Sequence, residues 1–184
     1  AARLVSYAAA YGPQLAMAYS NLSSLQMVSF EPEEAVLWGE KAVALARQLG
    51  DTATLSHALT NIGAARLDIG MMAEGRSLLG ESLRLALSAN LEERASRTWS
   101  ILGTEAMQEW QFDLAKQYLD EGIAYTSDHD LDNTRLYLQG YVANWLVYRG
   151  QWDEAVALAD ELLSQPRLSL TSRIQPLVAL GQVR

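Results

Sequence analysis

A repeat of 40 residues is the feature that most constrains what this chain can fold into. Positions 40 residues apart hold side chains of one size or one kind along most of the 184-residue sequence. Two of these columns are small throughout and a third is aliphatic: Ser23, Gly63, Gly103 and Ala143; Ala35, Gly75, Ala115 and Ala155; Leu22, Ile62, Leu102 and Val142. Four copies without an inserted residue indicate one supersecondary unit used repeatedly.

The third copy shows this unit most clearly. The residues that share its first helix face, at the spacing i, i+3, i+4 and i+7, are Trp99, Leu102, Gly103 and Ala106. After a break at 110–112, the stripe from Ala115 to Gly122 begins a second helix. A glycine inside a helix costs about 1 kcal/mol relative to alanine, so Gly103 and Gly122 indicate close approach of two antiparallel helix backbones. The unit is a helical hairpin, which cannot bury its apolar face alone and must stack on its neighbours.

The repeat resembles the tetratricopeptide repeat (TPR). Trp99, Leu102 and Gly103 match the pattern of the first helix in that family, and the stripe from Ala115 to Gly122 is similar to the pattern of the second. The usual period is about 34 residues, so longer helices or longer loops are expected here. HEAT and armadillo repeats, whose periods are nearer 40, are the alternative fold. The resemblance implies an all-α fold, a right-handed α-solenoid of TPR-like antiparallel hairpins, with about four repeats plus partial flanking helices.

We expect a single domain over 1–184, with repeats at 13–52, 53–92, 93–132 and 133–170. Residues 1–12 are expected to end a preceding helix, because Gly12 and Pro13 supply a helix stop and a fresh start. Residues 171–184 would begin a fifth repeat and cover the core of the fourth. Since both ends fall within helical patterns, we interpret the chain as a fragment of a longer protein.

Composition argues against several classes of function. The 22 acidic side chains outnumber the 14 basic ones, for a net charge of −8, and no cations cluster, so direct binding of nucleic acid is not expected. The absence of cysteine excludes disulfides and thiolate chemistry. No apolar run approaches the roughly 18 residues of a membrane helix, and no signal peptide is visible. We therefore expect no membrane association and a cytoplasmic location.

No constellation of catalytic residues is visible. His57 and His129 are the only histidines, and neither has a partner at the spacing of a metal site or a catalytic triad. No glycine is followed by lysine, as a phosphate-binding loop requires. The acidic loop 128–132 resembles a calcium loop only in part, because Asn133 and Gln139 stand where glycine and glutamate are needed. We therefore predict a protein that is not an enzyme, with no cofactor and no metal site.

The face expected to bind a partner lies beside the helix-pairing face, on the first helix of each hairpin. In a tetratricopeptide superhelix this stripe lines the concave groove, so the resemblance implies a binding site there. Its candidate residues are His57, Thr60, Arg97, Ser100, Thr104, Tyr137, Asn144 and Tyr148. Such a groove would be mostly neutral and hydroxyl-rich, with Arg97 as its one firm cation. Repeat domains that bind an acidic C-terminus use several cations in the groove, so a partner of that kind is disfavoured. A neutral peptide, another domain of the parent chain or a neutral small molecule fits such a groove better. The alternative is that these side chains only make the inner surface hydrophilic and bind no partner.

Segments 61–67, 130–138 and 149–155 resemble the helical-repeat region of large bacterial LuxR-type regulators of the MalT kind. Those proteins join an ATP-binding switch module, a repeat domain and a DNA-reading helix-turn-helix, and only the repeat region has a counterpart here. The resemblance implies a regulatory binding domain that senses an inducer or a partner. A stand-alone adaptor or co-chaperone-like peptide binder is the alternative.

Overall fold

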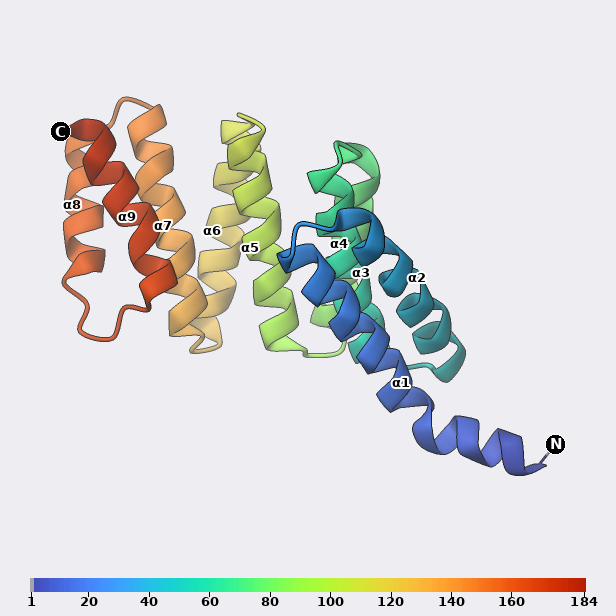
Figure 1. The fold of residues 1–184 in the computed structure, drawn as a ribbon. Coiled ribbons are helices and arrows are strands. Elements are labelled where there is room, and N and C mark those ends of the chain that lie inside the picture. The colour runs from blue at the N-terminus through green and yellow to red at the C-terminus, as the bar shows by residue number, and fades with distance from the viewer. Residues whose placement is uncertain (1) are drawn as a thin grey trace. The chain divides into compact units, whose positions relative to one another are not determined.

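The computed structural model describes the backbone of residues 2–184 and the side chains of residues 12–184. Every regular element in that part of the chain is an α-helix, and Figure 1 labels each of them. The helices are α1 (Ala2–Val28), α2 (Pro32–Leu49), α3 (Thr52–Asp68), α4 (Met72–Ser88), α5 (Glu92–Gln108), α6 (Phe112–Asp128), α7 (Asp132–Tyr148), α8 (Trp152–Leu163) and α9 (Leu170–Val183). The predicted all-α fold of repeated helix hairpins is confirmed.

The 40-residue period of the sequence is also the period of the helices. Helices α3, α5 and α7 begin at residues 52, 92 and 132, and α4, α6 and α8 begin at 72, 112 and 152. From α3 to α7 each helix has 17 residues, and three residues separate it from the next. Because loops of three residues are already short, the excess over a 34-residue repeat lies in the helices.

One backbone geometry closes the turns between the first eight helices. A residue with φ between 52° and 82° recurs every 20 residues, at Phe30, Gly50, Gly70, Asn90, Trp110, Asp130 and Gly150. The N–H of the following residue then donates to the carbonyl five positions earlier, over 2.8–2.9 Å. This is the Schellman closure of a helix C-terminus. The left-handed conformation costs a residue with a Cβ roughly 1–2 kcal/mol, which Phe30 and Trp110 nevertheless adopt.

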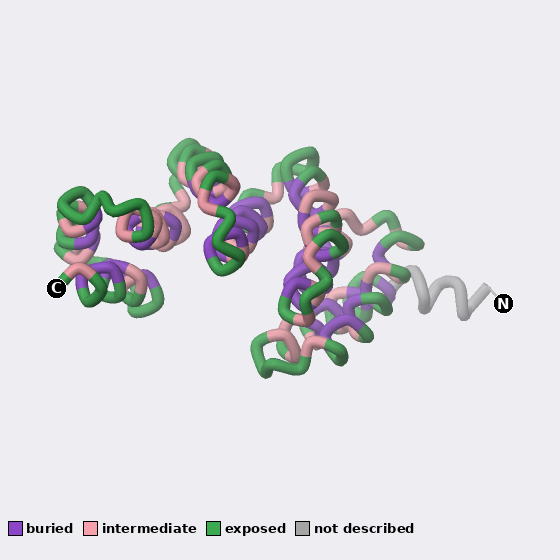
Figure 2. Tube along the Cα trace, turned by 90° about the horizontal axis from the view of Figure 1, so that it is seen from above, coloured by how far each residue is buried: buried purple, intermediate pink, exposed green. Residues whose placement is uncertain are grey.

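The helices gather into two compact units, Ala1–Thr98 and Trp99–Arg184, with the boundary inside α5. In the first unit, α1 packs on α2 and α3, α2 on α3, and α3 on α4. In the second unit, α7 packs on α6, α8 and α9, and α8 on α9. Figure 2 shows that buried residues lie within the helices, whereas the loops are mostly exposed. The interpretation of 1–184 as a single domain stays a prediction.

The expected helix end at Gly12 and Pro13 is absent, and α1 continues through both residues with Pro13 inside it. Gly12 is buried, and a Cβ built on it would lie 3.1 Å from both methyl carbons of Leu49, near the end of α2. Its small size therefore serves packing against α2. A proline removes only its own N–H donor and strains one turn, and in α1 the surrounding helix persists.

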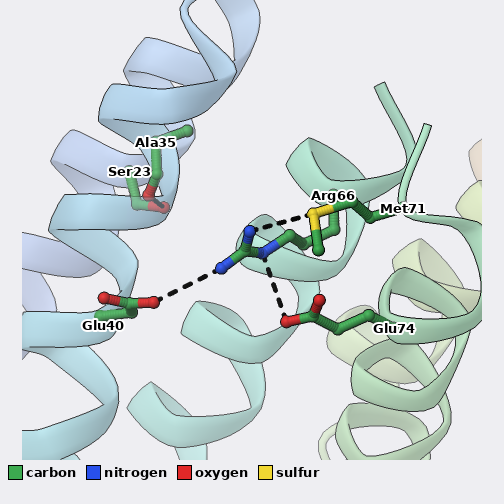
Figure 3. A network of polar contacts seen from close by, with 6 residues as sticks. All are labelled: Ser23, Ala35, Glu40, Arg66, Met71 and Glu74. Atoms are coloured by element: carbon green, nitrogen blue, oxygen red, sulfur yellow. Dashed lines mark hydrogen bonds and ion pairs between the residues drawn. The ribbon is translucent and has the colours of Figure 1, made fainter. Parts of the chain in front are cut away.

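The small-residue columns lie where the two helices of a hairpin approach closely, as predicted. A Cβ on Gly63 in α3 would lie 3.0 Å from the carbonyl oxygen of Gly75 in α4, and a Cβ on Gly75 would lie 2.8 Å from the carbonyl oxygen of Gly63. In the first hairpin the same positions hold Ser23 and Ala35, whose side chains Figure 3 shows. The Ser23 hydroxyl donates to the Ala35 carbonyl over 2.6 Å. Small side chains thus permit contact between helix backbones.

Arg66 joins three helices at the surface of the first unit (Figure 3). Its guanidinium reaches from α3 to Glu40 in α2 at 3.6 Å and to Glu74 in α4 at 3.4 Å. Both carboxylates are about half exposed, and surface ion pairs of this kind contribute roughly 0–1 kcal/mol each. This network fixes the orientation of neighbouring helices more than it stabilises them.

Candidate functional site

A pocket of about 580 Å³ opens in the first unit between α3 and the start of α5. Small-molecule sites in proteins usually have volumes of about 300–1,000 Å³, so it is large enough for a ligand or for a few side chains of a partner. Its floor and walls come from α3, from the loop after α4 and from the first two turns of α5. The lining residues are His57, Thr60, Asn90, Leu91, Glu92, Glu93, Arg94 and Arg97.

His57 is held in this pocket as a neutral imidazole. Its Nδ1 lies 2.8 Å from the Oγ of Ser20, a fully buried residue of α1. Burial, together with the positive charges of Arg94 and Arg97, lowers the pKa of His57 from 6.5 to about 4. At neutral pH the ring therefore offers a hydrogen bond and carries no charge.

Arg97 is anchored by a buried amide. Its Nη1 donates to the Oδ1 of Asn61 over 2.9 Å, and the Asn61 side-chain nitrogen donates to the Ser20 carbonyl over 2.9 Å. Asn61 is fully buried, so α1, α3 and α5 are linked through one side chain. Burial lowers the pKa of Arg97, and the neighbouring Arg94 lowers it too, yet a guanidinium remains cationic at any physiological pH.

Arg94 adds a second positive charge on the same side of the pocket. It precedes Arg97 by three residues, which places both on one face of α5. Burial lowers the pKa of Arg94, while the charges of Asp51 and Glu93 act in the opposite direction. Among the described side chains, no carboxylate lies within 4.0 Å of either guanidinium nitrogen group to form an ion pair. The pocket therefore presents two cations whose charge is not neutralised by direct contact.

The structure brings three of the sequence-predicted site residues together, namely His57, Thr60 and Arg97. Thr60 also belongs to a buried hydroxyl network, because its Oγ1 lies 2.7 Å from the Oγ of Ser82 and 3.1 Å from the Oγ1 of Thr98. Its hydroxyl is thus engaged within the protein, and the remaining polar groups of the pocket come from His57, Asn90, Glu92, Glu93, Arg94 and Arg97.

The other predicted residues lie in the second unit, and several are engaged there. Asn144 donates to both the carbonyl and the side-chain oxygen of Gln175 in α9, at 2.9 Å each. Thr104 is 8% exposed, and its hydroxyl donates to the Ile101 carbonyl. Ser100 is half-buried on α5.

The two predicted tyrosines of the second unit are more accessible. The Tyr137 hydroxyl donates to that of Tyr141 over 3.3 Å, and both rings are half-buried. Tyr148 is 44% exposed and stacks on Phe112 with ring centroids 5.4 Å apart. Trp110 packs edge-on against both rings, so Tyr148 forms part of an aromatic cluster at the turn between helices.

Sequence reasoning missed Arg94 and the loop residues Asn90 and Leu91. Arg94 lies three residues from Arg97, so a helical wheel of α5 carries the signal that pairs them. The column of Arg94 holds Gln14, Thr54 and Thr134, which is why the repeat pattern did not single it out. The expectation that Arg97 is the one firm cation is corrected by this second arginine in the same pocket.

The lowered pKa of His57 predicts that the stability of the fold depends on pH. In the unfolded chain His57 takes up a proton near pH 6.5, whereas in the folded chain it does so only near pH 4. Between these values the unfolded state binds more protons, so lowering the pH favours unfolding. We expect the urea midpoint of the wild-type chain to fall from pH 6.5 to pH 5, and that of His57→Gln to fall less. Parallel slopes for the two proteins would show that His57 does not titrate in this way.

Neither a membrane-spanning helix nor a cluster of metal ligands is present among the described residues. No helix in this part of the chain has both the length and the apolar character needed to cross a membrane. Nor do three or more histidine, aspartate or glutamate side chains converge there as a metal site would require.

Comparison with known proteins gives structural neighbours alone. No protein-family profile matches the chain, and no curated protein matches it. The solved structures that match include BtubC (BKLC) from P. vanneervenii, with a TM-score of 0.77 and 16% identity over 98% of this chain and 76% of that one. They also include a candidate kinesin light chain from Podosopora anserina with nearly identical TPR-like repeats, with a TM-score of 0.70 and 19% identity over 94% of this chain and 86% of that one. A variant of the same protein with the substitution Q17M matches equally well. The chain therefore has a TPR-like fold of repeated helix hairpins.

Proposed function

We propose that the chain is a non-catalytic binding domain that recognises its partner through the pocket between α3 and α5. The observation that carries this proposal is the pair of partly buried arginines, Arg94 and Arg97, that line the pocket without a carboxylate partner among the described residues. Burying charge without a counter-ion weakens a fold, so such an arrangement is typical of a site completed by a ligand. The TPR-like fold supports a role in protein interaction.

A catalytic reading of the pocket is less well supported. Ser20 and His57 are within the distance of a nucleophile and its base, at 2.8 Å. Ser20 is fully buried, however, and does not line the pocket, so a substrate bound there does not reach its hydroxyl. A histidine whose pKa is about 4 is also a weak general base at neutral pH. The pair holds α1 against α3, and binding is the better proposal.

The regulatory context is the finer part of the proposal. The resemblance of 61–67, 130–138 and 149–155 to LuxR-type regulators supports a bacterial, cytoplasmic regulator whose repeat domain senses an inducer, a peptide or another domain of the same chain. The coding sequence on either side tests this directly. An ATP-binding module upstream and a helix-turn-helix downstream are expected, whereas stop codons close to both ends would favour a stand-alone adaptor. In that protein we also propose that Tyr137 and Tyr148 of the second unit contact a partner.

Ligand binding can be tested by thermal shift with libraries of short peptides and metabolites. Compounds that raise the melting temperature of the wild-type chain are expected to lose this effect with His57→Phe and with Arg97→Met. Arg47→Met is the matched control, because Arg47 belongs to the same unit and forms a surface ion pair with Glu81 at 3.2 Å. Hits that stabilise both pocket variants as strongly as the wild type would place the binding site elsewhere.

A further inference from the structure

We propose that the pocket between α3 and α5 binds one carboxylate group at Arg94 and Arg97. The rest of the ligand is neutral or carries a positive charge such as an amino group. This inference rests on the proposed function, because it names the chemical class of ligand for the same pocket. A single carboxylate at a chain end, on a side chain or on a small molecule meets the description.

The first step is the charge that the protein leaves without a partner. The guanidinium of Arg97 is partly withdrawn from water, and among the described side chains its hydrogen-bond partner is the neutral oxygen of Asn61. Arg94 adds to the positive potential around this guanidinium, because its charge also lowers the pKa of Arg97. An anion between them would remove this penalty, whereas a neutral ligand would leave it in place.

The second step is the shape of the donor set. A guanidinium is planar and presents parallel N–H groups that match the two oxygens of a carboxylate. Arg94 and Arg97 project from one face of α5 within its first two turns, where the helix dipole also favours an anion. The neutral imidazole of His57, on the opposite wall, adds a hydrogen-bonding group without adding charge. These features select a compact planar anion.

The third step limits the charge of the ligand. Glu92 and Glu93 line the same pocket and are exposed at its rim. Two carboxylates at the entrance oppose two guanidinium groups inside, so a second or third negative charge on the ligand would be repelled. An amino group would instead be attracted to the rim. The pocket therefore favours one carboxylate over an acidic run, consistent with the expectation that a multiply acidic chain end is disfavoured.

The protonation of His57 supplies an independent readout. Burial is the main reason that this imidazole is neutral, and the charges of the two arginines that would hold the carboxylate lower its pKa in the same direction. A bound anion offsets their charge and raises the pKa of His57 above its value in the free protein. Binding is therefore coupled to proton uptake, and affinity increases as the pH falls from the pKa of His57 in the complex towards its pKa in the free protein.

Four peptides of three residues each test the proposal on the full chain. Trialanine is a zwitterion, N-acetyl-trialanine carries one carboxylate, its C-terminal amide is neutral, and N-acetyl-triglutamate carries several carboxylates. Titrations followed by NMR of the arginine Nε–H and histidine ring signals are expected to give at least tenfold tighter binding for the two singly carboxylated peptides than for the amide. They are also expected to bind more tightly than N-acetyl-triglutamate, and to raise the pKa of His57.

Two variants assign the effect to the arginines. Arg94→Met is expected to weaken binding of N-acetyl-trialanine by tenfold or more without disturbing the bond between Arg97 and Asn61, and Arg97→Met is expected to abolish it. Arg47→Met should bind as the wild type does. Equal affinity for acid and amide, tighter binding of triglutamate, or no binding of the acid would each overturn the proposal. In the thermal-shift screen, ligands without a carboxylate that lose their effect with His57→Phe and Arg97→Met would overturn this inference alone. Ligands that stabilise these two variants as strongly as the wild type would overturn the proposed function.

Discussion

Gly63→Leu is expected to lower the free energy of unfolding of the first unit by about 3 kcal/mol, at the upper end of what overpacking usually costs. A Cβ at this position would lie 2.8 Å from the Cγ of Leu79 and 3.0 Å from the carbonyl oxygen of Gly75. The Leu79 side chain is fully buried and cannot swing away, and the carbonyl belongs to the backbone of α4. The two helices must therefore separate, which exposes apolar surface along the whole hairpin.

Gly80→Leu is the matched control, because Gly80 lies in α4 of the same hairpin and a Cβ there meets nothing within 4 Å. Removing a glycine from a helix interior should leave stability unchanged or raise it by roughly 0.5–1 kcal/mol. Gly103→Leu, in the second unit, should fall between the two, because the nearest obstacle is a terminal methyl carbon of Leu119 at 2.9 Å. Urea denaturation followed by circular dichroism measures all three. If Gly63→Leu and Gly80→Leu were equally stable, close backbone approach would not be the reason for the small-residue column.

These glycines illustrate what the sequence could predict. The 40-residue columns carry packing information that is repeated four times, so the hairpins, their period and the close contact at Gly63 follow from side-chain size alone. At Gly12 the sequence instead predicts a helix stop, because a glycine followed by proline is typical of one, and the structure shows a packing glycine inside α1. The contact that decides between the two, with Leu49 on another helix, is not encoded near Gly12 in the sequence.

The turns and the pocket were less accessible to prediction, for two physical reasons. The left-handed residues recur every 20 positions, but Phe30 and Trp110 occupy them as well as glycine and asparagine, so residue type does not reveal the conformation. The pocket depends on residues outside the repeated columns, such as Arg94, and on burial that neutralises His57. Arg94 occurs in only one repeat, and a comparison of repeats detects the residues that they share and not those in which they differ.

The second large effect is expected at Asn61, whose amide links Ser20 in α1 to Arg97 in α5. Asn61→Leu keeps the number and branching of the side-chain heavy atoms but removes both hydrogen bonds, and it leaves the partly buried guanidinium of Arg97 without its partner. We expect the free energy of unfolding to fall by about 3 kcal/mol, because hydrogen bonds to charged groups are worth about 1.5–3 kcal/mol and a buried charge left unpaired adds to the loss.

A double-mutant cycle separates the charge from the packing. In Asn61→Leu/Arg97→Met the charge is removed together with its partner, so the double variant should lose at least about 1 kcal/mol less than the two single variants added together. Asn144→Leu combined with Arg97→Met is the control, because Asn144 bonds to Gln175 and shares no partner with Arg97. That pair should be additive within about 0.5 kcal/mol. Additivity at Asn61 as well would mean that the Arg97 charge costs the fold nothing. The strain that a bound carboxylate is proposed to relieve would then not exist.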